Sequence, residues 1–344
     1  AGDTADITAS TVDITATGSV GTADNNTNVD IAASGLVTIT AGDGTSNTAE
    51  TVYIRSTGDI SLGLVQVGDS DATLHAGDTV KILSVGDITD GNGATANVKA
   101  GVVALGVTTT ADNASSKAIG TAADLIEIEG VKAVSGLTIT QVDGATDSTD
   151  ASSFKGVHID TDAAFTLQND IYTTDNAAGT GITIKSDAAF IQNSKKLDVG
   201  SNGANNADMI YISASDLNLD TANSISTEGT VKLEDTSGNI TLNASGAHAG
   251  ANDITAVELA TIRNTGAAVT IISSGNVTLA DNGVYDITGG TAADLTITAT
   301  GDIALAGTGN NDGLKAKSIT LTASDDITQN AAQTNAVLET TSGN

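Results

Sequence analysis

Residues 231–242 read Val-Lys-Leu-Glu-Asp-Thr-Ser-Gly-Asn-Ile-Thr-Leu, which is two alternating apolar pairs joined by a short Gly-Asn turn. The same phrase returns at 52–62, 269–279, 295–305 and 319–327. Alternation with a period of two marks half-buried strands, because successive side chains point to opposite faces of a sheet. A repeat near this length predicts a repeat architecture before any motif is considered.

The first apolar residue of each phrase gives the period. From Val29 to Ile319, eleven steps cover 290 residues, about 26 residues a step. The step from Val257 to Leu295 is longer, and we expect a bulging loop there with an extra alternating pair at Val269. The full series is Val29, Val52, Val80, Val98, Ile126, Val157, Ile182, Ile210, Val231, Val257, Leu295 and Ile319.

Phrases that repeat in one direction favour strands that lie parallel, one coil above the next. Parallel pairing needs a crossover of a dozen or more residues, which a step of this length supplies. Such crossovers are right-handed in nearly all proteins. The sequence therefore predicts an all-β fold, a right-handed parallel β-helix (solenoid) of about 12–13 coils, in which residues 1–344 form one continuous array.

The turns have a local chemistry of their own. We expect the turn glycines to adopt positive φ, and the neighbouring Asp and Asn side chains to bond to nearby amides. Residues 254–263 begin like a capped helix, but the alternation of Val257 and Leu259 favours a strand.

Aromatic residues test the register. The tetrapeptide Asp-Ala-Ala-Phe ends at Phe165 and again at Phe190, so we expect the two phenyl rings to stack inside adjacent coils. Tyr53 and Tyr211 lie between inward-pointing neighbours and should face outward.

Composition excludes several classes of protein. The chain has no Cys, Pro or Trp, so neither disulfides nor thiolate metal sites can form. It carries 42 acidic against 13 basic residues, a net charge of −29. Such a surface repels nucleic acid and anionic lipid, because phosphate binding needs Lys and Arg. The sequence also lacks a run of about 18 apolar residues that would span a membrane.

No residue set in the sequence predicts a catalytic or cofactor-binding site. His75, His158 and His248 are far apart, and His158 is expected on the outer surface. Phosphate-binding glycine loops and nucleophile elbows are absent. A β-helix enzyme that acts on polysaccharides would need a carboxylate-lined groove. We therefore expect a protein that is not an enzyme.

Stacked acidic turns raise the question of calcium. Asp302 and Asp326 hold the same turn position in neighbouring phrases, and Asn276 precedes them. A calcium ion would relieve the repulsion between stacked carboxylates. In the alternative, each Asp caps its own turn and water screens the pair. Threonine pairs such as Thr296 and Thr298 also suggest an ice-binding ladder, but Lys and Tyr interrupt the row, as at Lys232.

The two ends enter and leave the repeat without caps. Residues 337–344 match the middle of the phrase at 234–239 and stop before its second strand. We therefore expect a segment of a longer array, or a fibre protomer whose ends dock onto other copies.

The phrases at 237–242, 274–279 and 300–305 resemble the repeats of filamentous-haemagglutinin-like bacterial adhesins of the two-partner-secretion type. The resemblance implies a large secreted β-helical rod that acts in adhesion or biofilm cohesion at the bacterial cell surface.

Three functional interpretations follow. The first is an extracellular structural or adhesive rod that forms, or belongs to, a long cell-surface filament, with self-association end to end or continuation of the same array. The second is a monomeric adhesin or ligand-binding module that displays loops such as Asp143–Ser153 and Gly200–Asp208 to a surface glycan or receptor. The third is a polysaccharide-active enzyme.

Overall fold

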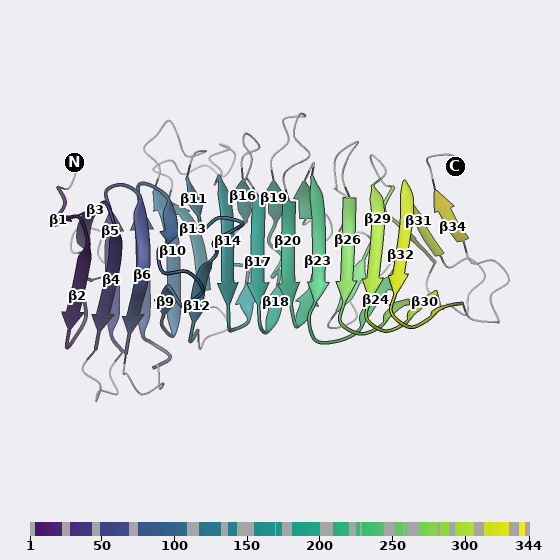
Figure 1. Ribbon diagram of the computed structural model, residues 1–344, viewed down its shortest axis with the longest axis horizontal. Helices are drawn as coiled ribbons and strands as arrows, with labels where there is room; N and C mark the ends of the chain where they lie inside the picture. The colour runs from purple at the N-terminus through teal and green to yellow at the C-terminus, as the bar shows by residue number, and fades with distance from the viewer. Residues whose placement is uncertain are drawn as a thin grey trace. The chain divides into compact units, whose positions relative to one another are not determined.

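The computed structural model forms an all-β parallel solenoid, and its described residues contain no helix (Figure 1). Packing divides the chain into two compact units, Ala1–Asn169 (unit 1) and Asp170–Asn344 (unit 2). A single array over 1–344 stays a prediction. The described residues are 4–22, 28–42, 49–68, 75–108, 117–131, 137–142, 155–168, 170–173, 181–199, 209–219, 225–227, 229–243, 252–256, 259, 268–280, 283–288, 293–305, 313–329 and 337–340.

Unit 1 winds between two parallel sheets. The first has the strand order β1-β3-β5-β7-β10-β13, and the second runs β2-β4-β6 and on through β8, β9, β11 and β12 to β14. The strands are β1 (Ile7–Ala9), β2 (Val12–Ala16), β3 (Val29–Ala33), β4 (Leu36–Ala41), β5 (Thr51–Ser56), β6 (Ile60–Val67), β7 (Thr79–Ser84), β8 (Ile88–Asp90), β9 (Val98–Lys99), β10 (Val102–Thr108), β11 (Ala118–Ile119), β12 (Ile126–Glu129), β13 (Leu137–Val142), β14 (Gly156–Thr161) and β15 (Phe165–Thr166).

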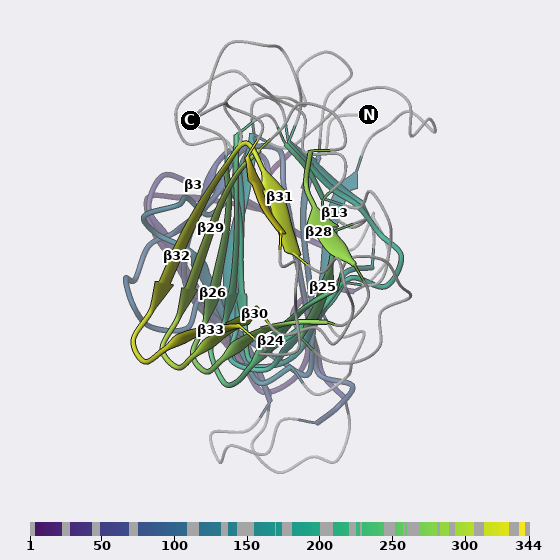
Figure 2. The same ribbon diagram turned by 90° about the vertical axis from the view of Figure 1, so that its right-hand side faces the viewer.

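Unit 2 winds over three sides, which Figure 2 shows in its later turns. One side carries β17-β20-β23-β26-β29-β32, and a second carries β18-β21 and β25-β24-β27-β30-β33. The third side carries two separate three-stranded sheets, β16-β19-β22 and β28-β31-β34. In the chain, their strands precede those of the first side.

The strands of unit 2 are β16 (Ile171–Thr173), β17 (Gly181–Ser186), β18 (Ala189–Ile191), β19 (Leu197–Val199), β20 (Met209–Ala214), β21 (Asp216–Asn218), β22 (Ile225–Thr227), β23 (Thr230–Asp235), β24 (Ile240–Asn243), β25 (Asp253–Thr255), β26 (Ala268–Ser273), β27 (Val277–Leu279), β28 (Val284–Asp286), β29 (Asp294–Ala299), β30 (Ile303–Leu305), β31 (Gly313–Ala316), β32 (Ser318–Ala323), β33 (Ile327–Gln329) and β34 (Val337–Thr340).

Like residues stack on like residues along the first side of unit 2. Val231 pairs with Val269, which pairs with Leu295 in the next turn. These three side chains are at most 1% exposed. On each of their strands, the alternate residues that point to the opposite face are half-buried. The alternation read from the sequence therefore sorts core from surface, and the core is a column of Val, Ile and Leu.

The described residues make about nine turns, fewer than the 12–13 predicted. Part of the excess comes from Val80 and Val98, which the spacing assigns to different turns. Val80 pairs with Val103, while Val98 lies in the other sheet and pairs with Val65 and Ile128. Val80 and Val98 thus follow each other within one turn. The spacing of apolar residues in the sequence cannot tell two strands of one turn from strands of successive turns, because apolar and polar residues alternate in both sheets. Parallel pairing is common to both hands of winding, so the right hand stays a prediction.

The extra residues in the long repeat of unit 2 also lie at a different place than the sequence predicts. Val269 is no extra pair within a loop, because it is the register partner of Val231. The extra residues come between β24 and β26 and carry β25, in which Asp253 pairs with Thr241 of β24. On the other flank of β25, the Asn252 side-chain oxygen accepts a hydrogen bond from the amide of β21 residue 217 at 2.7 Å. The insertion therefore supplies a strand between β21 and β24.

The strand predicted over residues 254–263 is confirmed only at Ile254 and Thr255, which belong to β25. Leu259 lies in a turn and is 1% exposed, and Val257 lies outside the described residues. The nearest strand is β25, which ends at Thr255.

Tyr53 and Tyr211 are half-buried between fully buried neighbours, as alternation predicts. Phe165 and Phe190 are 1% and 0% exposed. The two phenylalanines belong to different units, so their stacking stays a prediction.

His158 was expected on the surface, and this prediction is wrong, because the residue is only 3% exposed. Its neighbours Val157 and Ile159 pair with two separate short strands, β11 and β12. Residues 120–125 bulge out between those strands, opposite His158. A regular alternation does not reveal this bulge.

Candidate functional site

A polar feature that recurs among the described residues is the corner between two strands of a turn. In unit 2, Asn239 Oδ1 accepts a hydrogen bond from the Asn276 amide at 2.7 Å. Asn276 Oδ1 accepts from the Asp302 amide at 2.8 Å, and Asp302 Oδ1 accepts from the Asp326 amide at 2.9 Å. We name these four residues the unit 2 corner ladder.

Unit 1 contains the same arrangement. Asp59 Oδ1 accepts from the Asp87 amide at 2.9 Å, and Asp87 Oδ1 accepts from the Ala118 amide at 2.9 Å. The Lys117 ammonium lies 3.7 Å from Asp59 Oδ1. Each side chain of this unit 1 corner ladder therefore bonds to the turn that follows it in the chain.

This geometry corrects, for Asp302, the alternative in which each Asp caps its own turn. The Asp302 carboxylate joins its corner to the next one through the Asp326 amide. A donor N–H between stacked side chains offsets part of the repulsion between carboxylates. Within the described residues, no group of three or more His, Cys, Asp or Glu is arranged to hold a metal ion.

Corner glycines are required by close stacking and not by backbone conformation. A Cβ on Gly275 would lie 2.8 Å from the Gly238 carbonyl oxygen and would collide with Asn239 Oδ1. A Cβ on Gly301 would collide with Asn276 Oδ1. Neither glycine has a positive φ, so the positive φ expected at these corners is wrong.

The first glycine of each ladder lacks this constraint. A Cβ on Gly58 would meet nothing within 4 Å, and one on Gly238 would lie 3.6 Å from the nearest atom. Gly58 precedes Asp59 and Gly238 precedes Asn239, where each ladder begins. Within these two ladders, glycine is therefore sterically needed only where an earlier corner of the same ladder lies beside it.

Buried hydroxyl groups fix each corner to its neighbour a second time. Ser273 is 0% exposed, and its Oγ donates to the Gly238 carbonyl at 2.7 Å and accepts from the Gly275 amide at 3.1 Å. Ser84 does the same in unit 1, donating to Gly58 at 2.8 Å and accepting from the next corner amide at 3.0 Å. Each such serine therefore bonds to backbone groups of two corners at once.

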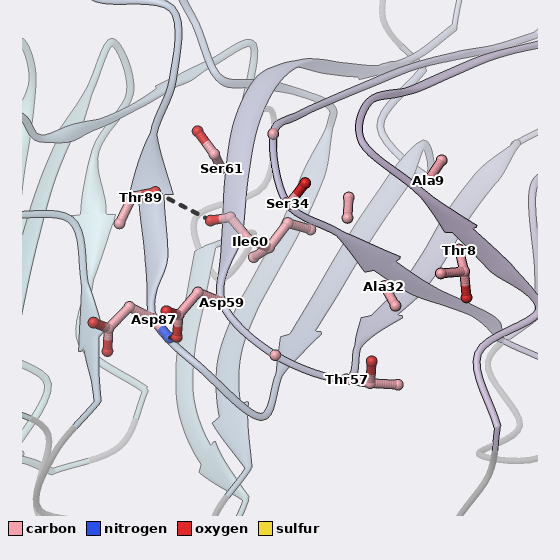
Figure 3. Close-up of a pocket in the computed structure, with 13 residues that line it drawn as sticks. Thr8, Ala9, Ala32, Ser34, Thr57, Asp59, Ile60, Ser61, Asp87 and Thr89 are labelled. Carbon is pink, nitrogen blue, oxygen red and sulfur yellow. Dashed lines mark hydrogen bonds between the residues drawn. The ribbon is translucent and has the colours of Figure 1, made fainter.

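A groove of about 690 Å³ opens beside the first corners of unit 1 (Figure 3). The corner of one turn has only Ser34 and Gly35, whereas the next has three residues, 57–59, and the groove is lined by both. Asp59 and Asp87 lie together at one end of it. The lining residues are Thr8, Ala9, Ala32, Ala33, Ser34, Gly35, Thr57, Gly58, Asp59, Ile60, Ser61, Asp87 and Thr89.

The groove offers hydroxyls and carboxylates to a ligand. Asp59 and Asp87 each already accept a backbone amide, so both carboxylates are held in place by the corner ladder. Thr89 Oγ1 donates to the Ile60 carbonyl at 3.3 Å. Such a lining suits hydrogen bonding to a polyhydroxyl compound, and its described residues pair no nucleophile with a base.

A second polar cluster lies on the outer face of unit 2. Lys232 Nζ lies 4.0 Å from the centre of the Tyr211 ring and 3.0 Å from Glu234 Oε2, and the Tyr211 hydroxyl donates to Glu234. Burial opposes ionisation of Glu234, but hydrogen bonds from Tyr211 and Lys232 outweigh it and lower the pKa of Glu234. Burial and the hydrogen bond to Glu234 raise the pKa of Tyr211.

Glu127 on β12 is a carboxyl group of unit 1 whose pKa is strongly shifted. Partial burial raises the pKa of Glu127 to about 7, and the charges of Asp90 and Asp160 add to the rise. Its Oε2 is buried and has no hydrogen-bond partner among the described residues. The Glu127 amide donates to the fully buried Asn97 at 3.0 Å, and Asn97 in turn donates to Asp90 at 2.8 Å.

The two histidines that the structure describes, His75 and His158, do not form a site together. His75 Nδ1 accepts from the Gly77 amide at 3.1 Å, which is a local turn contact. His158 is buried in β14, and His248 lies outside the described residues. The loops Asp143–Ser153 and Gly200–Asp208 also lie outside the described residues.

No protein-family model, curated protein or solved structure matches this chain. Over the part of the chain that the structure describes, no helix is long and apolar enough to cross a membrane.

Proposed function

We propose that this chain is a section of an extracellular structural or adhesive rod that forms, or belongs to, a long bacterial cell-surface filament. The observation that carries the proposal is the corner ladder, which recurs in both units. Its polar side chains tie each corner to the next, as Asn276 does to Asp302. Contacts between successive turns make a quasi-one-dimensional protein, which suits a mechanical or spacing role.

The buried column supports the same role. Ile271 lies between Leu233 and Ile297 in register, and all three are 0% exposed. Aliphatic stacking and ladder hydrogen bonds act along one direction and resist bending. The net charge of −29 opposes lateral clumping of such rods, because like charges repel.

The proposal places the chain among adhesins of the filamentous-haemagglutinin type, in adhesion or biofilm cohesion. Its partners are further copies or further repeats of the same array, together with a surface glycan or receptor.

Immunogold electron microscopy of native cells, with antibody raised against this chain, tests the proposal. We expect gold particles along filaments at the cell surface. Label in the cytoplasm, or surface label with no filament, would overturn it.

A monomeric ligand-binding module is the second candidate, and the groove of unit 1 favours it. If that groove binds a glycan, the purified chain should bind members of a glycan array and lose binding in Ser34→Trp, which fills the groove. Thr322→Trp, on an exposed position of β32, is the control. Release of reducing ends from a polysaccharide would instead support the enzyme interpretation.

A further inference from the structure

The groove of unit 1 crosses successive turns of the solenoid (Figure 3). Its lining includes the corner before β4, the corner before β6 and residues from the corner before β8 and from β8 itself. The groove therefore follows the stacking direction, in which the turns repeat about every 4.8 Å. Its volume of about 690 Å³ is in the range of ligand-binding clefts. A ligand held there would contact several turns at once.

Hydroxyl groups in the groove are available to a ligand. Ser34 and Thr57 are exposed, and Ser61 is half-buried. Within the described residues, none of these three hydroxyls forms a hydrogen bond. Ser61 and Thr89 are register partners in β6 and β8, so the groove presents similar groups one turn apart. A linear ligand whose own hydroxyls repeat along its length fits this arrangement.

Two carboxylates give one end of the groove a negative charge. Asp59 and Asp87 lie together there, and the Asp59 side chain is 71% exposed. The corner ladder holds both side chains through their Oδ1 atoms. The Lys117 ammonium, 3.7 Å from Asp59 Oδ1, offsets one of the two charges, so one negative charge remains at this end.

The rest of the lining excludes other ligand classes. Among the described residues that line the groove, there is no aromatic ring, no Lys and no Arg. An anionic ligand, such as a phosphate ester or a uronic acid, would be repelled by Asp59 and Asp87 and would find no cation in the lining. A ligand that binds by ring stacking would find no partner. The lining therefore suits a hydroxyl-rich ligand with a positive charge.

Gly58 keeps the groove open. A Cβ on this residue would meet nothing within 4 Å, and its φ is not positive. Neither stacking nor backbone conformation therefore requires glycine here, and the residue lines the groove. A larger side chain at this position would occupy the groove without straining the corner.

We propose that the groove of unit 1 binds a linear glycan that carries free amino groups, such as a polymer of glucosamine. An ammonium group of the glycan lies against Asp59 and Asp87, and its hydroxyls bond to Ser34, Thr57 and Ser61. Charge-assisted hydrogen bonds are roughly twice as strong as neutral ones, so the carboxylates select the amino sugar. This inference rests on the second candidate function, in which the groove binds a glycan, and it names the class of that glycan.

Isothermal titration calorimetry with the purified 344-residue chain tests the ligand class. The probes are oligomers of glucosamine, of N-acetylglucosamine and of glucose, with equal length and the same linkage. They carry an ammonium, an acetamide or a hydroxyl group at the same carbon atom. We expect the glucosamine oligomer to bind at least about tenfold more tightly than the other two, because a hydrogen bond to a charged group is worth that factor.

Replacing each carboxylate tests its part in binding. Asp59→Asn and Asp87→Asn keep an Oδ1 acceptor, and Asn239 and Asn276 hold the corresponding corner positions of unit 2, so we expect the fold to be retained. Each variant should weaken glucosamine binding at least about tenfold. The control is Asp187→Asn, which removes a carboxylate from an exposed corner residue of unit 2. An equal loss in the control would assign binding to the net charge of −29 and overturn the site.

Filling the groove tests the place of binding. Gly58→Leu should abolish binding, and Gly238→Leu, at the corresponding glycine of unit 2, should leave it unchanged. Glucosamine binding that survives Gly58→Leu would overturn the groove as the site. An oligolysine that binds as tightly as the glucosamine oligomer, with the same loss in Asp59→Asn, would overturn the glycan and assign the groove to a basic peptide.

The probes also separate this inference from the function on which it rests. If the three oligosaccharides bind equally and Gly58→Leu abolishes all binding, the glycan-binding function stands and the amino sugar is wrong. If none of the three binds, the groove is not a site for such a glycan, and both fail. The filament labelling on native cells tests the rod function independently of either result.

Discussion

Ile240 and Val277 are Cα partners in adjacent parallel strands, and both are 0% exposed. Each directly follows a corner asparagine, Asn239 or Asn276, and those two corners are themselves hydrogen-bonded. The buried core position and the corner hydrogen bond therefore both repeat once in every turn. Hairpin pairing or a sandwich would have placed Ile240 and Val277 in antiparallel neighbours or on opposite sheets, so this relationship establishes the stacking of turns.

Removing a core side chain from the column should weaken the solenoid strongly. Ile271→Ala deletes a fully buried side chain between two register partners, and we expect a loss of about 2–5 kcal/mol from the free energy of unfolding. Thr270→Ala, on the half-buried outer face of the same strand, should change it by about 0.5 kcal/mol or less. Urea unfolding followed by circular dichroism measures both, and similar losses would contradict the column.

The corner ladder should be sensitive to its acceptor atoms and not to its charge. Asn276→Ala removes the acceptor for the Asp302 amide, and we expect a loss of about 0.5–1.5 kcal/mol. Asn276→Asp keeps an Oδ1 acceptor at that position and should lose less. The same unfolding experiment compares them. An alanine variant as stable as the wild type would show that the bond contributes nothing.

Corner glycines should differ according to what lies before them. Gly275→Ala places a Cβ against Asn239 and the Gly238 carbonyl, and the strain should cost about 1–3 kcal/mol. Gly238→Ala, the matched control, finds its nearest neighbour 3.6 Å away and should be neutral or slightly stabilising, since alanine restricts the unfolded chain. Thermal unfolding of the two variants decides, and equal destabilisation would contradict the steric explanation.

Glu127 should make stability depend on pH. Its pKa in the folded protein is about 7, above the ordinary value of 4.5, so the folded state holds a proton that the unfolded state releases. This contribution leaves stability highest below about pH 4.5 and lowers it as pH rises to about 7. Glu127→Gln should flatten that part of the profile of thermal midpoint against pH.

The control for this profile is Glu129→Gln, which replaces the other glutamate of the same strand and removes an ion pair with Lys99 at 3.8 Å. A profile that flattens equally in both variants would assign the effect to net charge.

Strands, parallel stacking and the sorting of core from surface could all be predicted from the sequence, because they depend on a period that every phrase repeats. Val231 and Leu295 belong to one column, as the spacing indicates, but Val257 does not stand between them. Val257 and Val269 both begin alternating pairs, so the sequence holds no local signal that selects one. Strand pairing selects Val269, which pairs with Val231 in the turn before and with Leu295 in the turn after.

The corner was predicted only in part. The proximity of Asn and Asp to neighbouring amides follows from their short polar side chains, and it is confirmed for the side chains of Asn276 and Asp302. The need for glycine arises from contact between two turns, which a search for local backbone strain misses. Aligning the phrases turn on turn places Gly275 over Gly238, whose carbonyl oxygen would lie 2.8 Å from a Cβ on Gly275.

The corner ladder has a direction, because each acceptor serves the amide of the turn that comes later in the chain. A chain that emerges from the ribosome or a secretion pore with its N-terminus first would always present the acceptor before the donor arrives. Each finished turn then serves as a template for the next, and folding can proceed from start to end without waiting for distant segments. Emergence in the opposite sense would leave every new corner with an unsatisfied N–H until the following residues appeared.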